Sequence, residues 1–130
     1  LANTNATWKF AMFHFPPYAP TEDYPDIRAV WGPVFDKYHV DMMFGGHVHH
    51  YLRSKPMREG KPAGSPAEGT IYLVSVGIPS KDWSGGGPDY AEVIFSGPAL
   101  YQTLYIDGNT LELRAYSADG NERDRLTIVK

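Results

Sequence analysis

The residues best suited to chemistry in this sequence are three histidines at two places in the chain. His14 follows the apolar run Trp8–Phe13, while His47 and His49 follow a second apolar run and a pair of glycines. Side chains two residues apart in an extended segment point to the same side, so His47 and His49 can face one site. Neutral imidazole binds Zn and also suits Fe, Cu and Ni. Imidazoles that share a metal ion can activate water, so the sequence predicts a metal site at His14, His47 and His49.

Other residues near these histidines have simpler explanations. His50 points away from His49 in an extended segment, which indicates a structural role. His39 falls at the end of a predicted helix, where a solvated cation suits the helix dipole. Pro16 and Pro17 make a rigid corner, and Tyr18 beside them is a candidate for lining a substrate pocket. We assign no general acid, general base or nucleophile.

The elements that must position the histidines are two strands joined by a helix. Trp8–Phe13 and Val40–Phe44 are short apolar runs typical of buried strands. A strand, a helix and a strand within this length predict a βαβ unit with parallel strands. Ligand sites in open α/β sheets collect at the carboxyl ends of strands. We therefore expect His14, His47 and His49 to converge at one edge of the sheet.

The helix between these strands is predicted from an apolar stripe. Apolar residues recur at helical spacing at Ile27, Val30, Trp31, Val34, Phe35 and Tyr38. Asp23 is the expected N-cap and Pro25 suits the first turn. Gly32 and Pro33 should bend the helix or split it in two. We assign the stripe, together with Trp8, to the core.

The second half of the chain predicts mainly antiparallel strands. The expected strands are 51–55, 70–76, 100–106, 110–116 and 125–129. Turn signals separate them, in particular Asp107-Gly108-Asn109 and Asp119-Gly120-Asn121, so the last three strands should form an antiparallel meander. The segment 78–90, with three consecutive glycines, is the most flexible-looking loop.

Composition excludes several classes of protein. The 130 residues are enough for one domain, and 15 acidic against 12 basic residues give a net charge of −3. Such a charge offers no patch for nucleic acid or an anionic membrane. There is no apolar run of the ~18 residues that a membrane span needs. The absence of cysteine excludes disulfides, thiolate metal sites and a cysteine nucleophile.

Two motifs carry a resemblance to a known family. His14-Phe15-Pro16-Pro17-Tyr18 and Gly46-His47-Val48-His49 resemble the fourth and fifth signature blocks of the calcineurin-like metallophosphoesterases, in the purple-acid-phosphatase-like branch. The segments 29–38, 69–75 and the closing hairpin through Asp119-Gly120 are similar to the C-terminal portion of that family. The resemblance implies an α/β fold: the C-terminal half of an α/β/β/α sandwich, with one βαβ unit followed by a mainly antiparallel sheet.

The resemblance also implies chemistry. Proteins of this family hold two metal ions (Fe, Mn or Zn), and a metal-bound hydroxide attacks the phosphorus of a phosphoester substrate. Matched by motif, His14 and His47 resemble ligands of one ion, and His49 resembles a ligand of the other. Relatives of the purple type are often exported, which favours a location outside the cytoplasm.

The sequence departs from the family pattern in its carboxylates. The three earlier signature blocks, which supply the aspartate and asparagine ligands, do not occur in these 130 residues. Asp36 and Asp41 cannot replace them, since neither follows the end of a strand. The loop Thr21–Tyr24 also lacks the histidines of plant-like purple enzymes. We therefore expect residues 1–130 to be the C-terminal part of one catalytic domain, with partial or no metal occupancy and little or no activity alone.

Two other functions remain open from the residues. Three histidines and a water make a catalytic zinc site, so the chain could be a self-contained mononuclear hydrolase. The tyrosine-rich second half could instead be a β-rich binding or structural module without chemistry. If the chain is a partial domain, exposed strand edges should invite pairing between copies, and we expect a homodimer or larger assembly.

Overall fold

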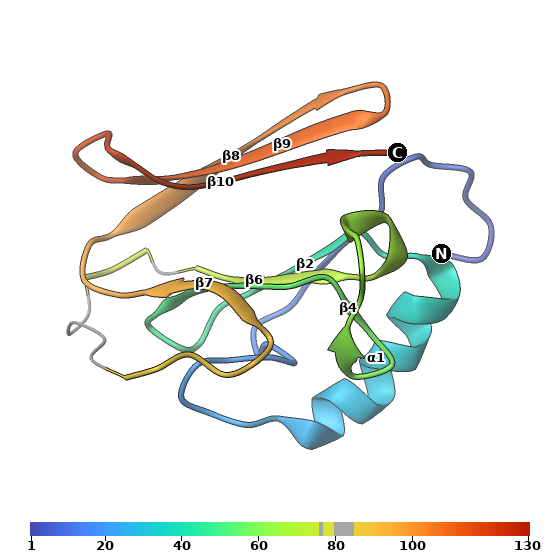
Figure 1. Ribbon diagram of the computed structural model, residues 1–130, viewed down its shortest axis with the longest axis horizontal. Helices are drawn as coiled ribbons and strands as arrows, with labels where there is room; N and C mark the ends of the chain where they lie inside the picture. The colour runs from blue at the N-terminus through green and yellow to red at the C-terminus, as the bar shows by residue number, and fades with distance from the viewer. Residues whose placement is uncertain (76, 80–84) are drawn as a thin grey trace.

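The protein is built in three layers: a helix, a five-stranded sheet and a three-stranded sheet (Figure 1). The computed structural model describes residues 1–75, 77–79 and 85–130. Its elements are β1 (Phe10–Met12), α1 (Pro25–Tyr38), β2 (Met42–Gly45), β3 (Tyr51–Ser54), β4 (Met57–Arg58), β5 (Lys61–Pro62), a 3-10 turn (Pro66–Glu68), β6 (Ile71–Val74), β7 (Ala91–Phe95), β8 (Leu100–Asp107), β9 (Thr110–Ser117) and β10 (Glu122–Val129). Val76, the expected end of one strand, and positions 80–84 of the expected flexible loop lie outside the described residues.

The five-stranded sheet contains the βαβ unit expected from the sequence. Its strand order is β1-β2-β6-β3-β7. β1 runs parallel to β2, with Phe10 opposite Met42, and β2 runs parallel to β6. β3 is antiparallel to both β6 and β7. The parallel pair β1 and β2 therefore ends at one edge of the sheet, where the two histidine motifs follow.

The three-stranded sheet is the expected meander, in the order β10-β9-β8. Alternate residues of β9 are buried, beginning with Leu111 and Leu113. These side chains pack on Met42, Ile71 and Leu73 of the five-stranded sheet. Figure 1 shows this sheet on one side of the five-stranded sheet and α1 on the other. The main core thus lies between the two sheets.

The helix α1 differs from expectation at its start and at Gly32-Pro33. The sequence predicted a bend or a split at Gly32-Pro33; α1 is one helix of 14 residues that contains Pro33, so the split does not occur. Tyr24, not Asp23, is the N-cap residue, and Pro25 occupies the first turn as expected. Asp23 instead pairs with Arg28, with 2.5 Å between Oδ1 and Nη1.

The apolar stripe of α1 is only partly buried. Phe35 is 2% exposed and packs with Met43 and Tyr72 beneath the sheet. Trp31 is 43% exposed and Val30 is 63% exposed, so their assignment to the core is wrong. The helix therefore covers the sheet through one large residue near its C-terminal end and leaves part of its apolar surface open.

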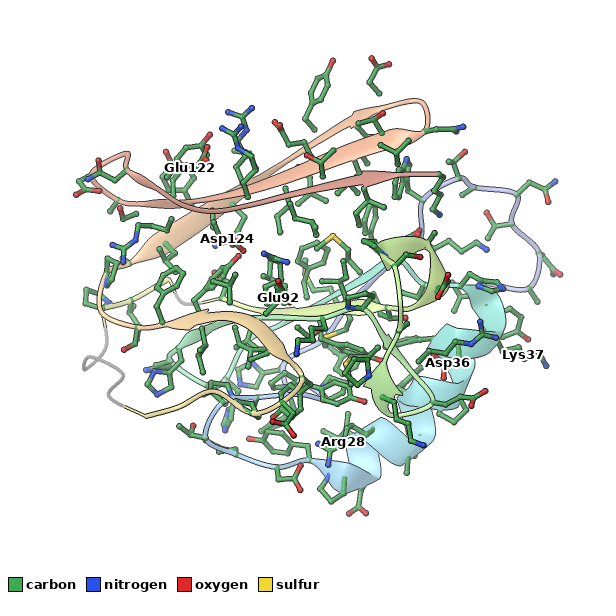
Figure 2. All side chains as sticks on the ribbon, in the orientation of Figure 1. Arg28, Asp36, Lys37, Glu92, Glu122 and Asp124 are labelled. Atoms are coloured by element: carbon green, nitrogen blue, oxygen red, sulfur yellow. The ribbon has the colours of Figure 1, made fainter. Side chains whose placement is uncertain are left out.

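A buried ion pair joins the two sheets. Arg53 of β3 donates from Nε and Nη2 to the Asp124 carboxylate of β10, at 2.6 and 3.0 Å. The Tyr51 hydroxyl donates to the same carboxylate at 2.7 Å. Figure 2 shows Asp124 between the sheets and Glu122 toward the outer side of the same strand. This cluster fixes the position of one sheet on the other.

Two features of the fold were not predicted from the sequence: the strand β7 and the hairpin of β4 and β5. β7 pairs with β3 at the far edge from β1. β4 and β5 form a hairpin whose two turn residues, Glu59 and Gly60, have φ angles of 52° and 75°. Positive φ at both positions is typical of a type I′ turn.

The outer strand β1 has an open edge. It is the terminal strand of the five-stranded sheet, and its side chains at Phe10 and Met12 are 39% and 80% exposed. Among the described residues, no helix combines the length and apolar character needed to cross a membrane.

Candidate metal centre

The backbone holds the two histidine motifs side by side. The Phe13 amide donates to the Phe44 carbonyl at 3.2 Å, and the Gly46 amide donates to the His14 carbonyl at 3.0 Å. These bonds extend the pairing of β1 and β2 past the ends of the strands. His14 and His47 therefore leave the sheet together at its carboxyl edge, where ligand sites of α/β sheets are found.

The two imidazoles face one another. His14 Nε2 lies 3.0 Å from His47 Nδ1, and the ring centroids are 5.0 Å apart in an edge-on arrangement. The rings are exposed at the surface, with Phe15 against both of them. The structure thus joins two of the three predicted ligands, although they lie 33 residues apart in the chain.

Two glycines make room for this approach. A Cβ at Gly45 would stand 2.7 Å from Pro16 Cβ, closer than such atoms are found. A Cβ at Gly46 would reach within 3.6 Å of His14 Nδ1. The sequence argument allowed either close approach or positive φ at this pair, and the structure uses close approach.

The third predicted ligand, His49, does not join the pair. Residues 47–50 form a bend, and His47 itself has a φ of 65° in the left-handed region. The extended conformation that would put His47 and His49 on one side is therefore absent. His49 is exposed. Within the described residues, no three His, Cys, Asp or Glu side chains converge as a metal-binding group.

An acidic residue that the sequence argument did not select lies beside His47. Glu22 Oε2 is 3.6 Å from His47 Nε2, an electrostatic contact that is too long for a hydrogen bond. The Tyr24 hydroxyl donates to the same Glu22 oxygen, and this bond raises the pKa of Tyr24 to about 12. No motif in the sequence marks Glu22 for this position.

The structure places Tyr18 away from the imidazole pair. Its ring packs against those of Tyr72 and Tyr90, with centroids 4.6 and 4.9 Å apart, on the helix side of the sheet. Only 7% of Tyr18 is exposed, and burial is the main cause that raises its pKa. Tyr18 thus lines a cavity beside α1.

The histidine pair fits a metal ion in part. Zinc binds imidazole nitrogen at ~2.0–2.1 Å, so two nitrogens 3.0 Å apart can contact one ion. A catalytic zinc site has three protein ligands. The pair of His14 and His47 is therefore an incomplete set for a bound metal and needs further donors.

Comparison with solved structures relates the fold to a purple acid phosphatase. The structure of purple acid phosphatase PPD1 from yellow lupin (Lupinus luteus) seeds matches 98% of this chain with a TM-score of 0.81 and 20% identity. GAP50, the anchor in the inner membrane complex of Plasmodium, matches 96% with a TM-score of 0.77 and 13% identity. Vps29 of Chaetomium thermophilum matches 98% with a TM-score of 0.50 and 13% identity.

Sequence comparison gives shorter matches. Two uncharacterized proteins of Mycobacterium tuberculosis, from strains CDC 1551 and H37Rv, are 56% identical over 32 residues, which is 25% of this chain. No family model matches the chain. The matches span 6% of these curated relatives and 26% of the lupin chain.

These likenesses define the class of fold. The protein has the mixed α/β architecture of the C-terminal portion of metallophosphoesterase-like proteins, as the sequence predicted. The structural relatives support a relationship to the calcineurin-like fold. At identities of 20% and below, the likeness concerns the fold, and the chemistry of this chain is a separate question.

Proposed function

We propose that this chain is the C-terminal part of a two-metal phosphoesterase catalytic domain, in which His14 and His47 bind one metal ion and His49 binds the other. The observation that carries the proposal is the facing pair of His14 and His47 at the carboxyl ends of two parallel strands. Fe, Mn or Zn ions at such a centre would supply Lewis acidity and an activated water. The chain's own contribution is to hold imidazoles at fixed positions.

The missing ligands would come from another part of a longer protein. The chain covers 26% of the lupin phosphatase, and its three candidate ligands, His14, His47 and His49, are too few for two ions. We therefore expect the 130-residue chain to bind phosphoesters weakly and to hydrolyse them at or near the rate of buffer. Metal occupancy should be partial or absent for the same reason.

The activity prediction is tested with the purified chain and p-nitrophenyl phosphate. We expect no hydrolysis above the metal-only blank after addition of Mn²⁺, Fe³⁺ or Zn²⁺, because the carboxylate ligands are missing. The release of nitrophenol, followed by its absorbance, measures this. Robust metal-stimulated turnover that is lost in His47→Ala would show that the chain is an enzyme by itself.

Metal titration separates this proposal from the mononuclear alternative. Zn²⁺ or Mn²⁺ should perturb the imidazole NMR signals of His14 and His47, and His14→Ala or His47→Ala should abolish the effect. If the ligands divide between two ions, His49→Ala should leave that effect in place. A three-histidine zinc site would instead lose its metal equally in all three variants. His39→Asn is the matched control, since His39 lies at the exposed left-handed end of α1, where asparagine is tolerated.

The position of His49 favours the two-ion proposal over the mononuclear one. His14 and His47 face one another while His49 stands outside their pair. The third possibility, a β-rich module without chemistry, gains support only if metal ions leave all three imidazoles unperturbed. In that case the paired histidines would be a structural contact between two loops.

A further inference from the structure

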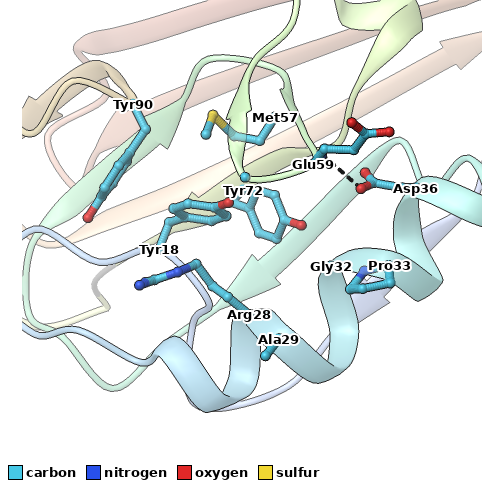
Figure 3. Close-up of a pocket in the computed structure, with 11 residues that line it drawn as sticks. Tyr18, Arg28, Ala29, Gly32, Pro33, Asp36, Met57, Glu59, Tyr72 and Tyr90 are labelled. Atoms are coloured by element: carbon cyan, nitrogen blue, oxygen red, sulfur yellow. Dashed lines mark hydrogen bonds between the residues drawn. The ribbon is translucent and has the colours of Figure 1, made fainter.

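The cavity that Tyr18 lines lies on the helix side of the five-stranded sheet. It has a volume of about 750 Å³ and opens between α1, the strand β6 and the hairpin of β4 and β5 (Figure 3). This volume is within the range of sites that bind small molecules. The cavity contains neither His14 nor His47, so it is distinct from the candidate metal centre.

The sequence of α1 makes this cavity. Two small residues of α1, Ala29 and Gly32, line the cavity, where larger side chains would fill part of the space. A Cβ added at Gly32 would meet no atom within 4 Å. Phe35, one turn further on, makes the large contact with the sheet. The hollow is therefore a consequence of residue size at these helix positions.

Aromatic faces line the opposite wall. Tyr18 packs at 4.6 Å from Tyr72 and at 4.9 Å from Tyr90, measured between ring centroids. All three rings border the cavity. The guanidinium of Arg28 stands 5.3 Å over the Tyr18 ring, so one aromatic face already holds a cation. Aromatic faces attract cations through their quadrupole.

The charge in the cavity is negative. Asp36 and Glu59 both line it, and the Glu59 amide donates to Asp36 Oδ2 at 2.9 Å, which fixes the carboxylate of α1 against the hairpin turn (Figure 3). The positive charge of Arg28 is already paired, since its Nη1 contacts Asp23 at 2.5 Å and the Pro17 carbonyl at 2.8 Å.

The negative charge of Asp36 raises the pKa of two tyrosines, Tyr18 and Tyr72. Burial is the main cause that raises the pKa of Tyr72 and of Tyr18, and the charge of Asp36 adds to it in both. In Figure 3 the hydroxyl end of Tyr72 points toward the Asp36 side of the cavity. The charge of Asp36 thus reaches both phenol groups, and the rings of Tyr18, Tyr72 and Tyr90 offer an apolar wall.

We propose that this cavity binds a small organic ammonium ion with an aromatic or aliphatic body, whose ammonium group contacts Asp36 and the hydroxyls of Tyr18 and Tyr72. A primary ammonium has three donors, which matches these three acceptors. An anion would face two carboxylates, and a neutral apolar molecule would take water from the Asp36 carboxylate without offering a hydrogen bond in return. The proposal is independent of the metal centre.

The test uses three probes with the same aromatic body and different charge: 2-phenylethylamine, 2-phenylethanol and 3-phenylpropanoate. Isothermal titration calorimetry on the 130-residue chain at pH 7 measures their affinities, and NMR signals of the tyrosine rings locate the binding. We expect the ammonium to bind at least about tenfold more tightly than the alcohol, because a charge-assisted hydrogen bond is made only with the ammonium. The carboxylate should bind most weakly.

Two variants and one control locate the site. Asp36→Asn keeps the shape and should weaken the ammonium at least about tenfold. Gly32→Leu should abolish binding of all three probes by filling the hollow, with an unchanged circular dichroism spectrum. Asp26→Asn removes the same charge from the exposed first turn of α1 and should leave affinity unchanged.

Several outcomes would overturn the proposal. They are no binding of 2-phenylethylamine at millimolar concentration, equal binding of the alcohol or the carboxylate, and normal binding by Asp36→Asn or by folded Gly32→Leu. None of these measurements involves His14, His47 or added metal. A negative result for the ammonium site would therefore leave the proposed phosphoesterase role untouched. A negative result for the metal centre would likewise leave the proposed ammonium site untouched.

Discussion

Gly45 sets the separation of the two histidine loops. Its missing side chain lets Pro16 approach, and a Cβ would stand 2.7 Å from Pro16 Cβ. We expect Gly45→Ala to lower the free energy of unfolding by about 1–3 kcal/mol, because overpacking forces the backbone to shift. Urea denaturation followed by tryptophan fluorescence measures the change.

Gly32→Ala is the matched control for that substitution. Gly32 lies inside α1 and a Cβ there meets open space. Alanine should therefore change the free energy of unfolding by at most about 1 kcal/mol, because the removed helix cost of glycine is offset by crowding of the new Cβ against the ring of Pro33. Equal effects of the two substitutions would contradict the role assigned to the contact between Gly45 and Pro16.

The buried tyrosines predict how stability depends on alkaline pH. Burial raises the pKa of Tyr72 and of Tyr51, and an unfolded tyrosine ionises near pH 10. A raised folded pKa gives stability that is present below pH 10 and is lost as the pH rises further. Each such tyrosine should lower the unfolding free energy by about 1.4 kcal/mol per pH unit above pH 10.

Urea titrations between pH 8 and pH 11 test this dependence. Tyr72→Phe should have a shallower decline above pH 10 than the wild type, while the two proteins share one pH dependence from pH 8 to pH 9. An unchanged decline in Tyr72→Phe would mean that this hydroxyl ionises as readily in the folded chain as in the unfolded one.

At the level of single residues, the sequence predicted that His14, His47 and His49 converge, and the structure brings only His14 and His47 together. His14 and His47 follow parallel strands, so backbone geometry alone brings them together. The position of His49 depends on the left-handed φ of His47. Positive φ cannot be predicted from the sequence at this position, because His47 is not a glycine. Glu22 approaches His47 through a loop whose path depends on tertiary contacts. The proposed roles of the histidines remain predictions.

At the level of elements, the contact that joins the two sheets is Arg53 with Asp124. The side chains are 9% and 6% exposed, and Asp124 also accepts from Tyr51. We expect Asp124→Asn to destabilise the protein by about 3–5 kcal/mol, because the guanidinium would stay buried without a counter-charge. Thermal or urea unfolding gives the value.

A second acidic residue on the same strand provides the control. Glu122 pairs with Arg125 at 3.0 Å on the outer side of β10, where its side chain is 34% exposed (Figure 2). Glu122→Gln makes the same chemical change and should cost at most about 1 kcal/mol. Similar losses for both variants would indicate that burial does not decide the strength of these pairs.

Most elements were predictable because their patterns are local. The meander has alternating strands separated by turn residues, and α1 has an apolar stripe. The strand β7 was not predicted, because a short apolar run such as Val93-Ile94-Phe95 does not by itself distinguish a strand from another buried segment. The exposure of Trp31 could not be predicted, because an apolar stripe on a helix does not determine how closely the helix packs on the sheet.

For the whole molecule, the open edge of β1 predicts self-association. Met12 is 80% exposed on an outer strand whose backbone can pair with another chain. We propose that a second copy pairs there when no other segment covers it. Sedimentation velocity over a wide concentration range should detect a dimer.

Substitutions on two edges locate this contact. Met12→Glu should shift the equilibrium to monomer, because a charge on an edge strand opposes pairing. Tyr105→Glu on β8, where the side chain is 65% exposed, is the matched control and should leave the dimer intact. A wild-type chain that stays monomeric at every concentration would refute the proposal.

The two sheets also differ in the sequence distances that they join. In the meander, Ile106 lies opposite Leu111 and Leu104 opposite Leu113, whereas in the five-stranded sheet Phe10 lies opposite Met42. Closing a loop between residues far apart in the sequence costs conformational entropy before the contacts that offset this cost have formed, and this slows folding. We therefore expect the meander to assemble early and the pairing of β1 with β2 late. The histidine pair would then form at the end of folding, on the part of the sheet that is slowest to close.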